Sequence, residues 1–208
     1  MTQAGTVSAW LSYLGGISVN LAQAVGAQQP AYNASGGIGG RPLITADGVD
    51  DVLVGVMTKG SAWPDYEFGI VGSRVAWGTN GDIWLAYATG VTTRWSLMDG
   101  TTNALFRSSV PVVLSIDGTT DPDGVVAHYS ADWIGAGGTI RVNGVTENTG
   151  AAAVPSRADG GNVLFGAMAA GTTAANIAVQ ALYMGPSLTA DQRTYLRAAL
   201  SFYTGVNC

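Results

Sequence analysis

Short apolar stretches separated by clusters of turn residues make up most of this chain, and they predict strands. In residues 66–70 bulky apolar positions alternate with a period of two, as in a half-buried strand. Turn signals separate the stretches at intervals too short for regular crossover helices, so the pattern favours a sandwich or barrel over βαβ units. Further strands are expected at residues 74–77, 82–88, 94–98, 110–117, 125–131, 139–145, 162–167 and 176–185.

The segment 41–57 predicts two strands joined by a tight corner. Leu43 and Ile44 precede the motif DGVDD at 47–51, and the apolar run 52–57 follows it. Gly48 tolerates a positive φ, and aspartate side chains accept hydrogen bonds from turn N–H groups. Three acids in five residues also suit a metal or catalytic site, but the corner itself requires these residue types, so we favour the turn.

Two connections carry their own turn signals. Asn80-Gly81, between two expected strands, favours a type I′ hairpin turn. The segment 59–65 contains Trp63-Pro64, and the proline disfavours helical geometry at Trp63, so this segment is expected to be a loop.

One helix is predicted, near the C-terminus. Thr189 and Gln192 have the spacing of a capping box, and Gly205 supplies a stop signal. Apolar residues recur at three- and four-residue steps and form one face, which we expect to pack against the edge of the sandwich. These residues are Tyr195, Leu196, Ala199, Phe202 and Tyr203.

Several motifs together resemble the concanavalin A-like (laminin-G-like) jelly-roll domains found in bacterial surface proteins and bacteriophage virions. In order they are NLAQ at 20–23, QPAY at 29–32, GRP at 40–42, DGVDD at 47–51 and VNG at 142–144. In the family the last of these is a hairpin at the end of a late strand. The family usually has an aromatic residue where this chain has Ala46. The resemblance implies an all-β fold, a two-sheet antiparallel jelly-roll sandwich with a short C-terminal helix, in a single domain over residues 1–208.

Composition narrows the classes of partner. Only 11% of the 208 residues are charged, the net charge is −5 and the basic residues are scattered, which disfavours binding to nucleic acid. No apolar run approaches the roughly 20 residues of a membrane-spanning helix. The first 16 residues lack the basic region of a signal peptide, which suits a protein made in the cytoplasm and built into a particle.

The acids and the single histidine do not form a recognisable catalytic motif. Glycoside hydrolases of this fold place two acids on alternate residues of one strand, but Glu67 and Glu147 lie in different segments. A remote acid pair brought together by folding stays open. His128 has neither a second histidine nor a Gly-x-Ser-x-Gly motif to support zinc binding or a catalytic triad, so we expect a structural or surface role.

Three acids on a Gly/Pro-rich loop offer a possible calcium site. Asp117, Asp121 and Asp123 lie within seven positions and could present hard oxygen ligands. Their spacing is not that of an EF-hand, and Asp-Gly and Pro-Asp-Gly are ordinary turn sequences. We favour an acidic turn and keep calcium as the one cofactor alternative.

Two tryptophans and the lone cysteine are further candidates. Trp63 and Trp133 lie next to predicted loops, where an exposed ring could stack on a sugar, whereas Trp84 and Trp95 lie within strands and are expected in the core. Cys208 cannot form an intrachain disulfide, which leaves an inert thiol or an intermolecular cross-link between neighbours in a particle.

These observations predict a non-enzymatic component of a bacteriophage virion, such as a head decoration, tail or fibre-associated protein. Its expected partners are other virion proteins, further copies of itself and host surface glycans. The alternative is a carbohydrate-binding, lectin-like domain of a bacterial surface or secreted protein, and a glycoside hydrolase ranks third.

Overall fold

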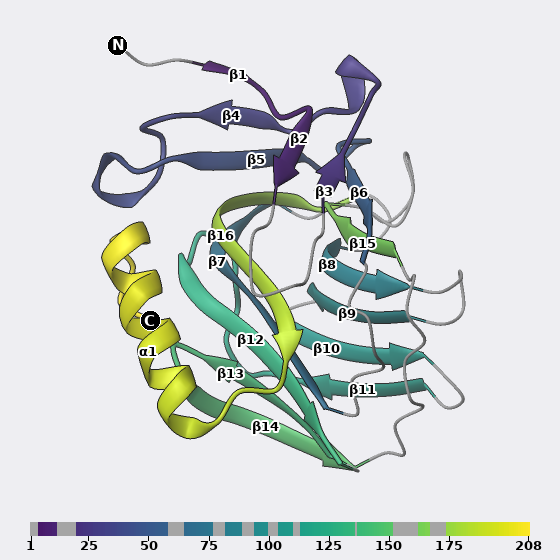
Figure 1. The fold of residues 1–208 in the computed structure, drawn as a ribbon, viewed down its shortest axis with the longest axis vertical. Coiled ribbons are helices and arrows are strands. Elements are labelled where there is room, and N and C mark those ends of the chain that lie inside the picture. The colour runs from purple at the N-terminus through teal and green to yellow at the C-terminus, as the bar shows by residue number, and fades with distance from the viewer. Residues whose placement is uncertain are drawn as a thin grey trace.

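The computed structural model shows a two-sheet antiparallel sandwich with one C-terminal helix, α1 (Ala190–Thr204), which confirms the predicted fold class (Figure 1). Each sheet has eight strands in the part of the chain that the structure describes. The described residues are 4–11, 20–57, 65–76, 82–88, 94–99, 104–109, 113–135, 137–151, 162–166 and 174–208. Within these ranges no helix has the length and apolarity needed to cross a bilayer.

The sheet that carries the helix is called here the helix-side sheet. Its strands, in spatial order, are β1 (Ala4–Thr6), β4 (Ala31–Asn33), β5 (Leu43–Asp47), β16 (Asn176–Pro186), β7 (Tyr66–Ala76), β12 (Ala127–Ile134), β13 (Gly137–Val142) and β14 (Val145–Ala151). The late strand β16 therefore lies between two early strands, β5 and β7.

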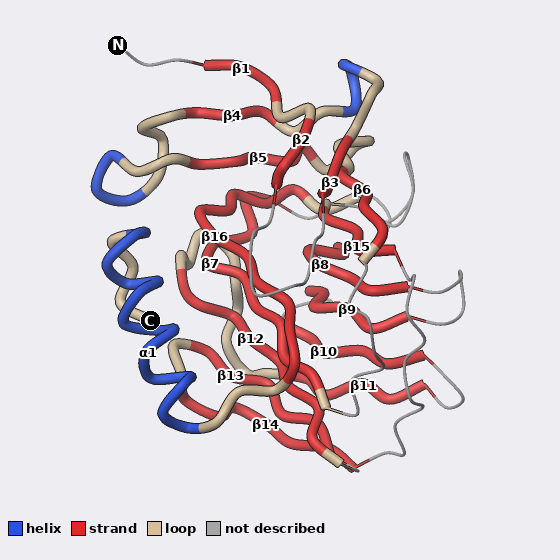
Figure 2. The backbone as a smooth tube through the Cα atoms, viewed as in Figure 1, coloured by secondary structure: helices blue, strands red, loops and turns tan. Residues whose placement is uncertain are grey.

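The second layer is called the far sheet. Its order is β11 (Val113–Asp117), β10 (Ala104–Ser109), β9 (Arg94–Asp99), β8 (Asp82–Ala88), β15 (Asn162–Phe165), β6 (Leu53–Val56), β3 (Asn20–Ala22) and β2 (Ala9–Leu11). Two short 3₁₀ turns, η1 (Gly26–Gln28) and η2 (Ile38–Gly40), complete the described elements (Figure 2).

The core lies between the two sheets. Trp84 of the far sheet meets Tyr129 of the helix-side sheet edge to face, with ring centroids 5.2 Å apart, and both residues are buried. Phe68, Ile70 and Trp133 extend the same buried cluster along β7 and β12. Burial of aromatic and aliphatic area of this kind supplies the main favourable term in folding.

The acidic motif at 47–51 is the corner between the sheets, as predicted. It connects β5 in one sheet to β6 in the other, and Gly48 has φ +80°. The Asp47 Oδ1 atom accepts a hydrogen bond from the Val49 N–H at 2.8 Å, and Asp51 Oδ2 accepts one from the Asp47 N–H at 2.9 Å. The carboxylates thus satisfy turn amides that the sheets leave unpaired.

Most predicted strands are observed. Outside the predicted ranges the structure adds β10, β14 and the short strands β1 to β4. The strand expected at 139–145 ends in a hairpin turn at its VNG motif, as the resemblance implied: Asn143 and Gly144 both have positive φ and connect β13 to β14. The sequence of β14, VTENTGA, is mostly polar and gives no apolar alternation. The predicted loop at 59–65, apart from Asp65, and the predicted turn at Asn80-Gly81 lie outside the described residues.

The prediction that residues 66–70 are half-buried is wrong, because β7 is buried on both of its faces from Tyr66 to Arg74. One face meets the core, and the other is covered from the side of α1. The helix begins with the predicted capping box and ends at Gly205, which has φ +74°. It lies over the central strands of the sheet rather than at an edge, since Arg193 contacts side chains of β7 and β12.

The face that α1 turns toward the sheet is not its aromatic face. Tyr195, Phe202 and Tyr203, which were expected to pack on the sandwich, are 76%, 70% and 68% exposed. The residues by which α1 reaches the sheet include Arg193 and Arg197, one turn apart, with Leu196 of the expected apolar face beside them. The helix is therefore attached largely by charged and hydrogen-bonding side chains.

Candidate functional site

A row of polar side chains lies on the outer face of the helix-side sheet, beneath α1. Strand alternation places them there, because their neighbours in sequence point into the core. Cross-strand register sets Glu67 opposite Asp132, and Ser130 opposite both Gly69 and Arg141. The row consists of Glu67 from β7, His128, Ser130 and Asp132 from β12, Arg141 from β13 and Tyr183 from β16.

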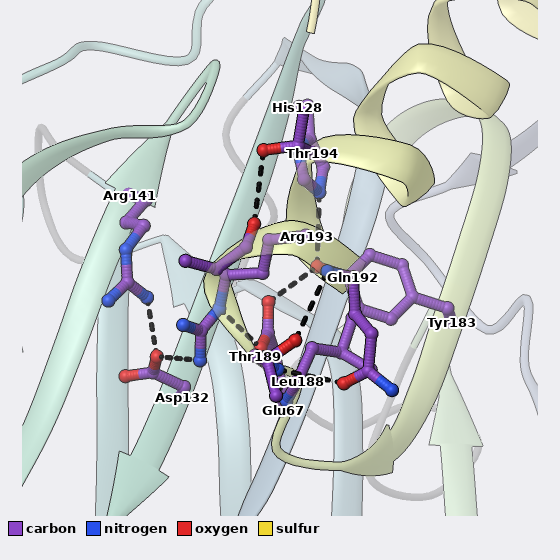
Figure 3. A network of polar contacts seen from close by, with 11 residues as sticks. Glu67, His128, Asp132, Arg141, Tyr183, Leu188, Thr189, Gln192, Arg193 and Thr194 are labelled. Carbon is purple, nitrogen blue, oxygen red and sulfur yellow. Dashed lines mark hydrogen bonds and ion pairs between the residues drawn. The ribbon is translucent and has the colours of Figure 1, made fainter.

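Arg193 of α1 joins the two acids of this row (Figure 3). Its Nε atom lies 2.8 Å from Glu67 Oε2 and its Nη2 atom 2.7 Å from Asp132 Oδ2. Arg141 Nη1 lies 2.6 Å from the same Asp132 oxygen. Because the two carboxylates are 2% and 1% exposed, these ion pairs replace the water that burial removes.

Folding has therefore brought a remote acid pair together, but not in a form that suits glycoside hydrolysis. A hydrolase needs one carboxyl group that keeps a proton to give to the leaving group. Here one guanidinium donates to both Glu67 and Asp132. The arrangement is a structural ion-pair network that fixes α1 to the sheet.

Tyr183 connects this network to His128. Its ring lies directly over Gly69, where an added Cβ would be 2.6 Å from Tyr183 Cε1. Its hydroxyl lies 3.3 Å from Glu67 Oε1, to which it donates, and 3.2 Å from His128 Nε2. Burial, followed by the charge of Glu67, raises the pKa of Tyr183 well above its ordinary value, so the hydroxyl stays protonated.

A cavity of about 240 Å³ opens beside the network, between the sheet and α1. Most of the residues that line it have polar side chains; the lining comprises Glu67, His128, Ser130, Arg141, Gly144, Tyr183, Ala190, Arg193, Thr194, Leu196 and Arg197. Burial and the nearby charge of Arg197 lower the pKa of His128 to about 4, so its imidazole is neutral at pH 7. The cavity therefore offers guanidinium, imidazole, hydroxyl and carboxylate groups in one place.

Comparison with known proteins identifies similar folds. No protein-family model and no curated protein matches the sequence. The solved binding domain of botulinum neurotoxin serotype G matches with a TM-score of 0.61 at 12% identity, over 92% of this chain and 50% of the other. The binding domain of Paraclostridial Mosquitocidal Protein 1 gives 0.60 at 9% identity, over 96% and 48%.

The receptor-binding domain of botulinum neurotoxin D also matches, with a TM-score of 0.55 at 8% identity, over 78% of this chain and 43% of the other. The chain thus spans about half the length of each of these toxin domains. At such identities the likeness establishes a shared β-sandwich fold.

The two tryptophans expected at an exposed sugar site have different outcomes. The prediction for Trp133 is wrong: the residue is 1% exposed, and its Nε1 donates to the Gly135 carbonyl at 3.1 Å. Its place near the end of β12 still points it into the core, because strand alternation continues past Ala131. Trp63 lies outside the described residues.

The calcium interpretation of Asp117, Asp121 and Asp123 is also corrected. The buried guanidinium of Arg74 donates to Asp123 and, at 3.2 Å, to Asp121. These two carboxylates are therefore already paired with a cation of the protein. The three acids do not converge on one point. In the described ranges the only acids, histidines or cysteines that gather in threes within 4.8 Å are those of the corner at 47–51.

Cys208 is partly buried rather than free at the end of a tail. Its backbone N–H donates to Ser201 Oγ at 3.0 Å, and burial raises the pKa of its thiol. Because the thiolate is the reactive form, this environment slows disulfide exchange. The intermolecular cross-link stays a prediction.

Sequence reasoning did not find the residues that make the cavity. Arg141, Tyr183, Arg193 and Arg197 show no motif, and the contacts between Glu67 and Arg193 span 126 positions. The available signal was local: Arg193 and Arg197 lie one turn apart on a helix whose aromatic residues occupy a different face.

Proposed function

We propose that this chain is a non-enzymatic recognition domain that binds cell-surface glycans and serves as a component of a bacteriophage particle. The observation that carries the glycan assignment is the polar cavity between α1 and the helix-side sheet. Its guanidinium, imidazole and hydroxyl groups suit a ligand that presents many hydroxyl groups in fixed directions.

The size of the cavity supports a small sugar unit. Pockets for drug-sized ligands usually measure about 300–1,000 Å³. The cavity here measures about 240 Å³, which suits one terminal sugar rather than a long segment of polysaccharide. The ion pairs at Glu67 and Asp132 hold its floor in place, so the site is preorganised before any ligand binds.

The hydrogen bonds of the two acids support binding without hydrolysis. Both carboxylates accept from Arg193, which binds them to each other and to α1 instead of leaving them directed at a substrate. The particle assignment rests on the sequence motifs that resemble virion jelly-roll domains, and the toxin binding domains of similar fold are compatible with a recognition role.

A glycan array tests the binding activity. The labelled chain should bind a defined subset of glycans, and Thr194→Trp should abolish that binding because Thr194 lines the cavity. Ala198→Trp is the matched control, since Ala198 is exposed on the same helix and does not line the cavity. Binding that survives Thr194→Trp, or the absence of any bound glycan, overturns the glycan assignment.

Two further measurements test the remaining parts. Incubation of the chain with each bound polysaccharide should release no reducing ends, and release that Glu67→Gln abolishes would show a hydrolase. Immunogold electron microscopy with antibodies to the chain should label phage particles from the source strain. Unlabelled particles would overturn the virion role while leaving the glycan result intact.

A further inference from the structure

Two nitrogen atoms at the cavity are buried and lack a hydrogen-bond partner among the described residues. They are His128 Nδ1 and Arg197 Nε. His128 as a whole is only 2% exposed. A buried polar atom without a partner costs about 1–3 kcal/mol, more when it is charged, so such atoms in a cavity wall mark a place where a ligand group would be stabilised.

Among the described charged groups around the cavity, one cationic side chain has no acidic partner. Arg193 bridges Glu67 and Asp132, and Arg141 shares Asp132, so the two carboxylates of the network are fully engaged. Arg197 forms no ion pair within the described part of the chain, although it lines the same cavity. A partly buried guanidinium without a counter-charge favours an anionic ligand.

The position of Arg197 is set by the hairpin turn beneath it. Its guanidinium lies so close to Gly144 that a Cβ at Gly144 would be 1.5 Å from Arg197 Nη1. The φ of +77° at Gly144 belongs to the β13–β14 turn, which therefore provides both the turn and the space for this side chain.

We infer that Arg197 and His128 bind an acidic group of the ligand, a carboxylate on a sugar, so that the cavity recognises acidic glycans. This inference rests on the proposed glycan-binding function and names the ligand class for the same site. Arg197 supplies the charge and an Nε–H donor, and His128 supplies a second donor at Nδ1 when its imidazole is protonated.

The Tyr183 hydroxyl fixes which nitrogen of His128 carries hydrogen. It donates to Glu67 Oε1 at 3.3 Å, so His128 Nε2, 3.2 Å away, donates its hydrogen to the hydroxyl oxygen. Nδ1 therefore gains a hydrogen when the imidazole is protonated, and the imidazolium then donates from Nδ1 to the carboxylate.

Anion binding should also be linked to protonation of His128. The groups that line the cavity with it are Arg197 and Arg193 of α1, Tyr183 of β16, Glu67 of β7 and Arg141 of β13. Burial and Arg197 lower the pKa of His128 to about 4, and a bound carboxylate counters the effect of Arg197. The ligand should therefore raise this pKa and bind more tightly as the pH falls from about 5 toward 4.

NMR can follow this site directly, because His128 is the only histidine in the chain and gives a single imidazole signal. The ¹⁵N-labelled protein is titrated with sodium glucuronate, with methyl glucoside as the neutral match and with sodium sulfate as a free inorganic anion. Glucuronate should raise the His128 pKa by about one unit, a tenfold tighter association with the protonated form, and methyl glucoside should not.

Variants separate the site from general charge effects. Arg197→Gln should weaken glucuronate binding by about tenfold or more, as expected for loss of a charge-assisted hydrogen bond, and Arg41→Gln, at an exposed position, should not. His128→Gln should weaken glucuronate binding and remove its pH dependence. Melting curves and circular dichroism confirm that each variant is folded.

The outcomes distinguish this inference from the proposed function. If every glycan bound on the array is neutral, and Thr194→Trp abolishes the binding, the acidic-group inference is overturned and the glycan function stands. A shift of His128 with sulfate and glucuronate, but no glycan bound on the array, would support the anion site and overturn the glycan function. No shift with any probe, or equal binding by Arg197→Gln, would overturn the anion site itself.

Discussion

His128 is a neutral imidazole held inside a protein, and this makes stability depend on pH. Its pKa is about 4 in the folded chain and about 6.5 in an unfolded one, so unfolding takes up a proton between these values. The free energy of unfolding should therefore fall as the pH drops from about 6.5 to 4, by roughly 3 kcal/mol from this residue alone.

Urea unfolding of the wild type and His128→Gln at pH 7 and pH 4 isolates that contribution, because other titrating groups cancel in the difference. The stability of the wild type relative to the variant should be about 3 kcal/mol greater at pH 7 than at pH 4. A difference that does not change with pH would show that the imidazole ionises normally in the folded protein.

Gly69 is the second residue for which the structure predicts the effect of a substitution, because there is no room for a side chain at this position. Because a Cβ would lie 2.6 Å from the buried Tyr183 ring, Gly69→Ala should lower the free energy of unfolding by about 1–3 kcal/mol. Gly185→Ala is the control, since Gly185 also lies in a strand but a Cβ added there would have no neighbour within 4 Å, and it should change stability little. Equal effects at the two glycines would contradict the close packing of Tyr183 on β7.

At the level of the element, an arginine of α1 should contribute more to stability than an aromatic residue of the same helix. Arg193→Gln should cost roughly 3–5 kcal/mol, because it leaves two buried carboxylates short of their shared counter-charge. Phe202→Ala should change stability by about 0.5 kcal/mol or less, because Phe202 is 70% exposed.

Chemical unfolding monitored by far-UV circular dichroism gives both values. A larger loss for Phe202→Ala than for Arg193→Gln would mean that the aromatic face of α1 packs on the sandwich.

The helix boundaries were predictable because the capping box and Gly205 are local signals. Its orientation was not, since periodicity identifies an apolar face without showing what that face contacts.

At the level of the whole molecule, alternation and turn chemistry favoured a sandwich or barrel, and the resemblance to jelly-roll domains implied the two-sheet sandwich that is observed. The corner at 47–51 was recognised from its own residues. The partners of each strand were not predictable in this way. The candidate site depends on those partners, because it combines β7, β12, β13 and β16 with α1. Arg193, for example, meets an acid 126 positions earlier in the chain.

The position of β16 between β5 and β7 has a consequence for biosynthesis. Until residues 176–186 have been made, β5 and β7 each present an open edge, and the N-terminal strands cannot join the rest of their sheet. Long-range pairing of this kind folds slowly and leaves unpaired edges exposed to other nascent chains. The ribosome must therefore release residues 176–186 before the sandwich can close.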